Sequence, residues 1–284
     1  MAHVRMKSIL GQLAGVVAAV ALMTNGALAA PKNKKKAKAK PRPPTISVAQ
    51  AMKDLGSSNV SKAVIGAKRL GLGKDAKALN ALLDRLALGA APRVLAAALH
   101  AVAKHGAPRA HDTIAPYLGY RDSRVRAAAV TAMGAIKGPH TIKPVLAALR
   151  DGNKDVRAAA LKVVEKRKIR RAVEAILALM KKGDEATAPA FAVMANPNMA
   201  RMVGELIGKA PNAIVARTLG LILLRPSFKP ESARVEVVKA LGKVPGTDAV
   251  EQLSAYLEAI PEKPPRKSRM VAQKYLEARL GGGQ

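Results

Sequence analysis

Histidine, cysteine and serine carry much of the catalysis and metal binding found in proteins, and this chain offers few of them in usable patterns. His100 and His105 lie five positions apart, which does not place two ligands on one helix face as an i, i+4 spacing does. No acidic cluster accompanies the histidines, no serine has a G-x-S-x-G setting, and cysteine is absent. We therefore expect no metal site, no cofactor and no catalytic residue, and we interpret the chain as a non-enzyme.

The chemistry that the composition does favour is the binding of anions. The 284 residues include 49 Lys and Arg against 19 Asp and Glu, a formal net charge of +30, and such an excess predicts attraction to polyanions. Aromatic residues make up only 2% of the chain and Trp is absent. Contacts would therefore be made to phosphate or carboxylate groups, and any nucleic-acid binding would be independent of base sequence.

Basic residues gather in three places that are candidates for binding a partner or a polyanion. The Lys- and Pro-rich segment 30–44 contains no acid and includes Lys34, Lys35 and Lys36. Three further residues stand at the starts of expected helices, namely Arg93, Arg124 and Lys154. The densest run, which we call the turn cluster, occupies an expected turn and consists of Lys166, Arg167, Lys168, Arg170 and Arg171. An ordinary solvated surface is the alternative interpretation of each group.

A repeating helical pattern must position these residues. Segments that begin at Val94, Val125 and Val156 share the template V-x-A-A-A, and successive starts are 31 residues apart. A fixed period of this size indicates stacked supersecondary units. In the second of these segments Asp122 stands at the helix N-cap position, and one stripe of the helix carries the apolar residues Val125, Ala129, Ala132, Met133 and Ile136.

Gly, Pro, Asn and Asp between apolar segments predict paired helices from Thr45 onwards. The expected pairs are 47–55 with 58–71, 75–87 with 91–105, 108–119 with 122–137, 139–150 with 153–167, 170–182 with 184–195, 198–208 with 211–224, and 247–260 with 265–280. Segment 230–243 has the pattern of a second helix, because its A-L-G sequence matches A-M-G in 122–137, so we expect its first helix to be missing near 225–229. The predicted fold class is all-α, a solenoid of about seven helix pairs.

The openings of two expected second helices carry the resemblance to a known family. They read D-x-x-V-R-x-x-A from Asp122 and, with a different spacing of the aspartate, D-V-R-x-x-A from Asp155. This pattern resembles the HEAT-repeat family of armadillo-like α-solenoids, in which a proline within the first helix, here Pro116 or Pro144, is also typical. The resemblance covers roughly 45–280. It implies a right-handed α-α superhelix whose second helices line a concave face and whose surfaces serve mostly for binding.

The same resemblance implies a structural role for part of the basic set. In HEAT repeats the arginine of this pattern pairs with an acidic residue near the turn between helices, which implies a repeat ladder of Asp122, Arg126, Asp151 and Arg157. Two HEAT-like subgroups match poorly. DNA glycosylases depend on aromatic residues beside an aspartate, and nothing in the sequence points to the proteins that attach bilins to phycobiliproteins.

The first residues have the three-part layout of a secretory signal peptide. Arg5 and Lys7 precede an apolar run over 9–23, and Ala27-Leu28-Ala29 forms a small-residue cleavage signal. The run is shorter than the ~20 residues that span a bilayer, although an uncleaved anchor is the alternative. We expect cleavage after Ala29 and export to the periplasm or beyond. The expected organisation is a signal peptide (1–29), a disordered basic tail (30–44), the solenoid (45–280) and a flexible tip (281–284).

Two functional hypotheses follow from these features. The leading one is an exported, non-enzymatic scaffold that binds a protein partner through an elongated solenoid surface. The alternative is a polyanion binder that uses the basic tail and a basic solenoid face to hold extracellular DNA, lipopolysaccharide or an acidic cell-wall polymer. Basic residues clustered on one face would favour the polyanion, whereas an even spread beside an apolar groove would favour a protein partner. The sequence leaves the identity of the partner and the oligomeric state open.

Overall fold

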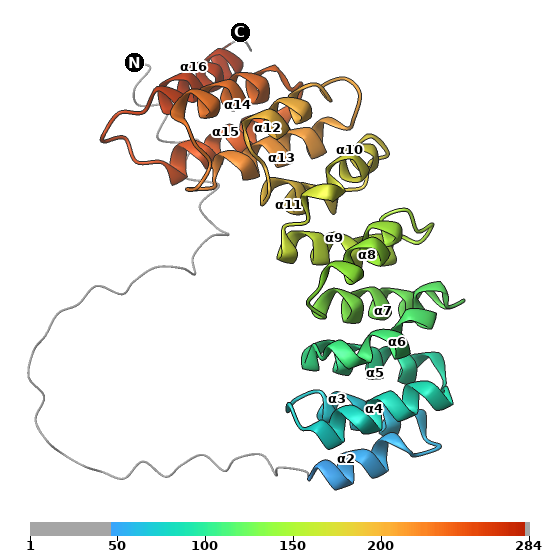
Figure 1. The fold of residues 1–284 in the computed structure, drawn as a ribbon. Coiled ribbons are helices and arrows are strands. Elements are labelled where there is room, and N and C mark those ends of the chain that lie inside the picture. The colour runs from blue at the N-terminus through green and yellow to red at the C-terminus, as the bar shows by residue number, and fades with distance from the viewer. Residues whose placement is uncertain (1–46, 282–284) are drawn as a thin grey trace, which may run out of the picture. The chain divides into compact units, whose positions relative to one another are not determined.

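The computed structural model describes residues 47–281, which form a series of stacked α-helices joined by short turns (Figure 1). No strand occurs in this range, which confirms the all-α prediction. The expected signal peptide and basic tail, with Lys34, Lys35 and Lys36, lie outside the described residues.

Fifteen α-helices make up the described part of the chain. They are α2 (Val48–Leu55), α3 (Val60–Leu70), α4 (Ala76–Leu88), α5 (Pro92–His105), α6 (His111–Ile114), α7 (Ser123–Ala135), α8 (Ile142–Ala148), α9 (Lys154–Arg167), α10 (Val173–Lys181), α11 (Thr187–Ala192), α12 (Pro197–Gly204), α13 (Asn212–Leu223), α14 (Glu231–Lys243), α15 (Thr247–Ala259) and α16 (Lys267–Gly281). Four 3₁₀ turns precede or extend them, at Pro108–Ala110, Ala115–Gly119, Pro139–Thr141 and Arg170–Ala172.

The expected helix positions agree with these bounds to within a few residues, and the differences have local causes. The expected helix 108–119 is divided into two 3₁₀ turns and the short α6. Pro108 and Pro116 lack the backbone N–H that a continuous α-helix would use. At α7 the side chain of Asp122 accepts a hydrogen bond from the backbone N–H of Arg124, so the predicted N-cap is confirmed. Gly281, expected in the flexible tip, is the last residue of α16.

The helices are arranged in two layers. The second helices of the pairs pack on one another in chain order, from α3 through α5, α7, α9, α11 and α13 to α15. The first layer contains the remaining helices, in which α2 packs on α4, α4 on α6, α12 on α14 and α14 on α16. Seven helix pairs and a terminal α16 result, in agreement with the predicted count of about seven. The predicted last pair, 247–260 with 265–280, is wrong, because α15 is the second helix of a pair with α14.

The expectation that a first helix is missing near 225–229 is wrong. Helix α14 lies in the first layer, where it packs on α12 and α16, and α15 follows α13 in the second layer. The A-L-G sequence misled the prediction because it marks a close helix contact that occurs in both layers. A Cβ at Gly242 on α14 would lie 2.5 Å from the ring of Tyr275 on α16, and one at Gly134 on α7 would lie 2.3 Å from Val163 on α9.

Small side chains let the second-layer helices approach one another closely. The whole apolar stripe predicted for α7 is buried, with Val125, Ala129, Ala132 and Met133 at 0% exposure and Ile136 at 1%. Close packing of this kind brings the ends of neighbouring second-layer helices within reach of long side chains. None of the helices in residues 47–281 combines the length and apolar character needed to cross a bilayer.

Candidate functional site

An Arg–Asp bridge joins the repeats at the N-terminal end of α7. The Nε and one terminal nitrogen of Arg126 donate to the two carboxylate oxygens of Asp151 over 2.8 and 2.9 Å. The other terminal nitrogen donates to the carbonyls of Tyr120 and Arg121. Both charged side chains are largely buried, with 20% and 15% exposure. The hydrogen bonds from Arg126 lower the pKa of Asp151, so the pair is charged and structural.

The same bridge recurs one repeat later with a partner that sequence reasoning missed. Arg157 on α9 donates to Asp184 over 2.8 Å and to the carbonyls of Asp151 and Gly152. Asp184 follows a glycine in the turn before α11, as Asp151 stands in the turn before α9. That recurrence of an aspartate between paired helices was the signal that could have identified it. The bridge lines a cavity of about 650 Å³ together with α10 and the turns that follow α8 and α10.

Asp122 does not join this ladder. Its carboxylate pairs with Arg124 over 2.6 Å, and the hydrogen bonds from Arg124 lower its pKa to about 2. Arg124, expected to be available for a ligand, is thus held at the start of its own helix, although 66% of its side chain remains exposed. Arg93 and Lys154 are exposed at the corresponding ends of α5 and α9.

Arg167 has a role that differs from the one expected of the turn cluster. Its guanidinium donates to the hydroxyl of Thr141 over 2.7 Å and to the carbonyls of Ile136 and Gly138, beyond the end of α7. Carbonyls at a helix C-terminus lack intrahelical donors and carry partial negative charge, which a guanidinium satisfies. Since these bonds engage both terminal nitrogens of Arg167, the side chain ties α9 to α7 and is not available to a ligand in the way that its neighbours are.

Other basic side chains cap neighbouring helices in the same way. Arg225, after α13, donates to the carbonyls of Ala192 and Ala195 at the end of α11. Arg279 on α16 donates to the carbonyls of Gly242 and Val244 at the end of α14. Some of the excess basic residues therefore form hydrogen bonds to the carbonyls at helix ends.

The remaining residues of the turn cluster are exposed. Lys166, Lys168, Arg170 and Arg171 all lie on the surface, and Lys168 has a left-handed backbone with φ of 53°. Lys168 and Arg170 line a half-open pocket of about 300 Å³ together with residues from the turns before α12 and α14. None of the residues lining this pocket, all within the described range, is acidic.

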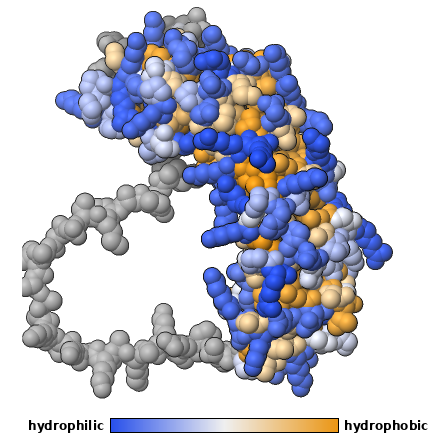
Figure 2. All heavy atoms as spheres, in the orientation of Figure 1, coloured by the Kyte–Doolittle hydropathy of each residue, from blue (hydrophilic) through white to orange (hydrophobic). Residues whose placement is uncertain are grey.

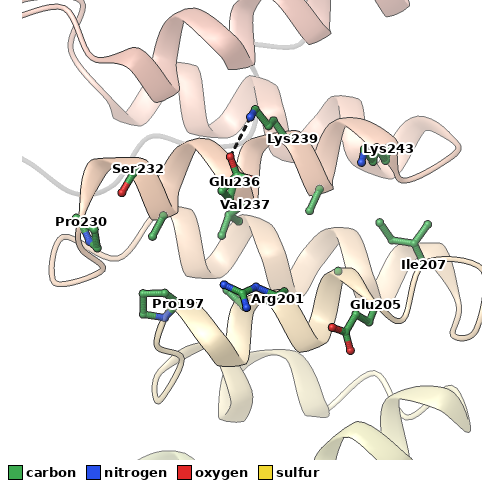
Figure 3. Close-up of a pocket in the computed structure, with 14 residues that line it drawn as sticks. Pro197, Arg201, Glu205, Ile207, Pro230, Ser232, Glu236, Val237, Lys239 and Lys243 are labelled. Atoms are coloured by element: carbon green, nitrogen blue, oxygen red, sulfur yellow. Dashed lines mark hydrogen bonds and ion pairs between the residues drawn. The ribbon is translucent and has the colours of Figure 1, made fainter.

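A larger groove runs between α12 and α14 (Figure 3). Its volume is about 710 Å³, and its surface is mainly formed by apolar residues such as Ala200, Ala233 and Val237. Charges of both signs surround it: Arg201 and Glu205 extend from the α12 side, and the α14 side carries Glu236, Lys239 and Lys243. Lys239 and Glu236 form an ion pair of 2.9 Å.

The described histidines do not gather with acidic side chains into a metal-binding cluster. Within 47–281, no three His, Asp or Glu side chains lie close enough together to hold a metal ion. The histidines contribute to packing and turns: His105 bonds to the carbonyl of Leu70, and His111 bonds to the side chain of Asp112.

Comparisons with known proteins agree with this architecture. The family model described as HEAT repeats matches residues 79–152, and comparison with curated proteins finds no match. The phycocyanin lyase complex from Nostoc sp. PCC7120 is similar in structure, with 17% identity, a TM-score of 0.45, and 87% of this chain and 99% of that chain covered. A designed armadillo repeat protein shows 15% identity and a TM-score of 0.35, with coverage of 82% and 99%.

Human deoxyhypusine hydroxylase is also similar, with 17% identity, a TM-score of 0.30, and 82% of this chain and 84% of that chain covered. All three TM-scores lie below 0.5, so no functional property carries over from these proteins. The family match covers the copies of the repeat template that begin at Val94 and Val125, and the described helices pair in two layers along the stack. The described chain is an α-solenoid of stacked helix pairs, and its residues 79–152 are similar to HEAT repeats.

Proposed function

We propose that the protein is an exported, non-enzymatic scaffold that binds a protein partner through the surface of its solenoid. HEAT repeats are typically a protein-interaction fold. The observation that carries the proposal is the groove between α12 and α14, with its apolar surface and its rim of mixed charge. Protein interfaces combine an apolar centre with a polar rim of this kind, whereas a polyanion site would have a rim of one sign.

The distribution of surface polarity supports the same proposal. Figure 2 shows hydrophilic residues along the whole visible stack, with hydrophobic residues at the surface between them. Hydrophobic residues at the surface beside hydrophilic ones offer the apolar contacts that a protein partner uses. Export rests on the signal-like sequence of 1–29.

Capture of partners by a rim variant tests the scaffold. Arg201 and Lys243 are exposed on opposite sides of the groove, so the double variant Arg201→Glu/Lys243→Glu should keep the fold while it reverses part of the rim. The control Lys62→Glu/Lys68→Glu reverses two exposed charges on α3. We expect at least one captured protein to be depleted fivefold by the rim variant and retained by the control. Identical capture by both variants would count against the groove.

A second candidate function, polyanion binding, is favoured by the charge that the fold leaves uncompensated. From Ile46 onwards the chain has 40 Lys and Arg and 19 acids, yet only six Lys or Arg side chains form ion pairs with acids in the described residues. The test compares the chain from Ala30 with one from Thr45 for binding to duplex DNA, heparin and lipopolysaccharide over a salt series. Binding by the shorter form, with log affinity falling steeply against log salt, is the expected signature.

A further inference from the structure

The pocket between the turns that follow α9, α11 and α13 has the composition of a site for one compact anion. Four cationic side chains from two distant segments line it, and two small polar side chains complete it: Lys168, Arg170, Arg225, Lys229, Asn196 and Ser227. No carboxylate of the described residues belongs to its lining. Its volume of about 300 Å³ falls at the lower end of the range for small-molecule pockets. Cations gathered without acids repel one another, and a bound anion would relieve this repulsion.

Arg225 is held in a fixed position at the wall of this pocket. One terminal nitrogen donates to the carbonyls of Ala192 and Ala195, and the other lies 3.3 Å from the hydroxyl of Ser227. A guanidinium has five N–H donors, so two remain after these three contacts. Partial burial lowers the pKa of Arg225 from its ordinary value, but a guanidinium stays protonated in proteins. A preorganised guanidinium with donors to spare is a strong partner for an oxyanion.

Lys168 adds a second, independent observation. It is the one non-glycine residue of the described range with a positive φ, and it ends α9 in the left-handed conformation. At the equivalent end of α5 the chain has Gly106, with φ of 62°, which adopts this conformation without strain. A lysine in a conformation that suits glycine stores backbone strain beside the pocket, and strained residues concentrate at functional sites.

The N-terminal end of helix α12 adds further positive potential to the pocket. Asn196 and Pro197 line the pocket and form the N-terminal end of this helix. The side chain of Asn196 caps the backbone N–H of Met199, so the positive end of the helix dipole adjoins the cationic side chains.

We propose that this pocket binds a single phosphate group, either free or at the end of a larger molecule. A phosphate monoester is dianionic near neutral pH and presents three acceptor oxygens, which matches several cations arriving from different segments better than one carboxylate does. The site goes beyond the proposed function, since it holds one group in one place whichever macromolecule the rest of the surface binds.

Titration of the full chain with inorganic phosphate, by calorimetry at constant ionic strength, tests the proposal. The informative variant is Lys168→Gly, because it removes one cation and also the backbone strain. We expect it to unfold about 2 °C higher than the wild type and to bind phosphate at least fivefold more weakly. A weaker yet more stable variant cannot be explained by misfolding. Lys168→Gly/Lys229→Gln should lose at least twentyfold in affinity.

A matched control removes the same charge elsewhere. Lys154→Gln/Lys162→Gln neutralises two exposed lysines of α9 outside the pocket, and its phosphate affinity should stay within twofold of the wild type. The proposal is overturned if binding does not saturate, or if the control variant and the pocket variants weaken it equally. Either result would mean diffuse attraction by the net charge.

The two sources of a phosphate group are distinguished by a second arm. Glycerol phosphate is compared with vesicles of phosphatidylcholine containing phosphatidic acid, at equal accessible phosphate. Stronger binding to one of these two ligands, lost in Lys168→Gly, supports the site. The preferred ligand then shows whether the phosphate group is presented in solution or on a membrane surface. Indifference of both ligands to Lys168→Gly overturns the site. A failure to capture a protein partner affects neither outcome, so the two proposals are tested separately.

Discussion

Arg126 on α7 and Asp151 in the turn before α9 form a two-pronged ion pair that joins one repeat to the next. The two residues are 25 positions apart in sequence, and they belong to different helix pairs. Arg157 and Asp184 repeat the arrangement over 27 positions. At both steps the ladder therefore links one helix pair to the next.

Removal of one partner of the bridge should destabilise the solenoid. Asp151→Asn leaves the guanidinium of Arg126 without a counter-charge, and we expect a loss of about 2 kcal/mol, less than a fully buried pair would lose because both side chains keep some exposure. Arg126→Lys keeps the positive charge but should also lower stability, since an ammonium cannot make the paired hydrogen bonds. Urea unfolding measures both. Arg124→Gln, which breaks an exposed pair, is the control and should change little.

The stability of the protein should depend on pH through the carboxylates of Asp122 and Asp151. Arg124 holds the pKa of Asp122 at about 2, and Arg126 lowers the pKa of Asp151, against an ordinary value of 3.8. A lowered pKa means that the stabilisation is complete above about pH 4 and is lost as the pH falls towards 2. We expect the urea midpoint to fall over this window and to fall less in Asp151→Asn. Parallel curves for the variant and the wild type would contradict this assignment.

Gly134 should be intolerant of even one added carbon. A Cβ at this position would lie 2.3 Å from a methyl of Val163, so Gly134→Ala should cost about 1–3 kcal/mol in spite of the better helix propensity of alanine. Shortening the neighbour in Gly134→Ala/Val163→Ala should recover much of the loss. Gly204→Ala meets only Ala240 at 3.5 Å and should be neutral or slightly stabilising. Thermal unfolding of the three variants measures the contrast.

Neighbouring members of the turn cluster should behave differently. Arg167→Gln removes the donors to Thr141, Ile136 and Gly138, and we expect a loss of about 1–2 kcal/mol together with faster hydrogen exchange at the end of α7. Lys166→Gln alters an exposed side chain and should change stability by less than ~0.5 kcal/mol. Equal effects of the two changes would refute the capping role of Arg167.

Much of the fold could be predicted because its signals are local. Helix starts, turn residues and apolar stripes are set by residues within or next to a single helix. The 31-residue period of the V-x-A-A-A template then indicated how the helices pair. The layer of α14 could not be predicted in the same way. Its A-L-G sequence reports a close contact with a following helix, and Gly134 and Gly242 make that contact in different layers.

The candidate site was less predictable, since it depends on how far one repeat is rotated against the next. Asp122 and Asp151 were both available to Arg126, and only the geometry shows that Arg126 reaches forward to Asp151 while Arg124 takes Asp122. Only one wall of the anion pocket could be identified from the sequence, because Lys168 and Arg170 belong to a run of basic residues. Its other wall contains Arg225 and Lys229, from divergent repeats about 60 residues later in the chain, which no local pattern connects to the turn cluster.

The forward reach of the arginines also affects how the protein can be rebuilt. If each helix pair were a self-contained module, repeats could be exchanged, deleted or duplicated at any turn between pairs. Here a cut between Arg126 and Asp151 separates a cation from its only carboxylate partner in the described chain, so the smallest exchangeable unit spans a repeat boundary. Engineered versions should therefore be joined at the start of α7 or α9, before Arg126 or Arg157. A graft that keeps each arginine with the aspartate of the following turn should fold where a graft of whole helix pairs does not.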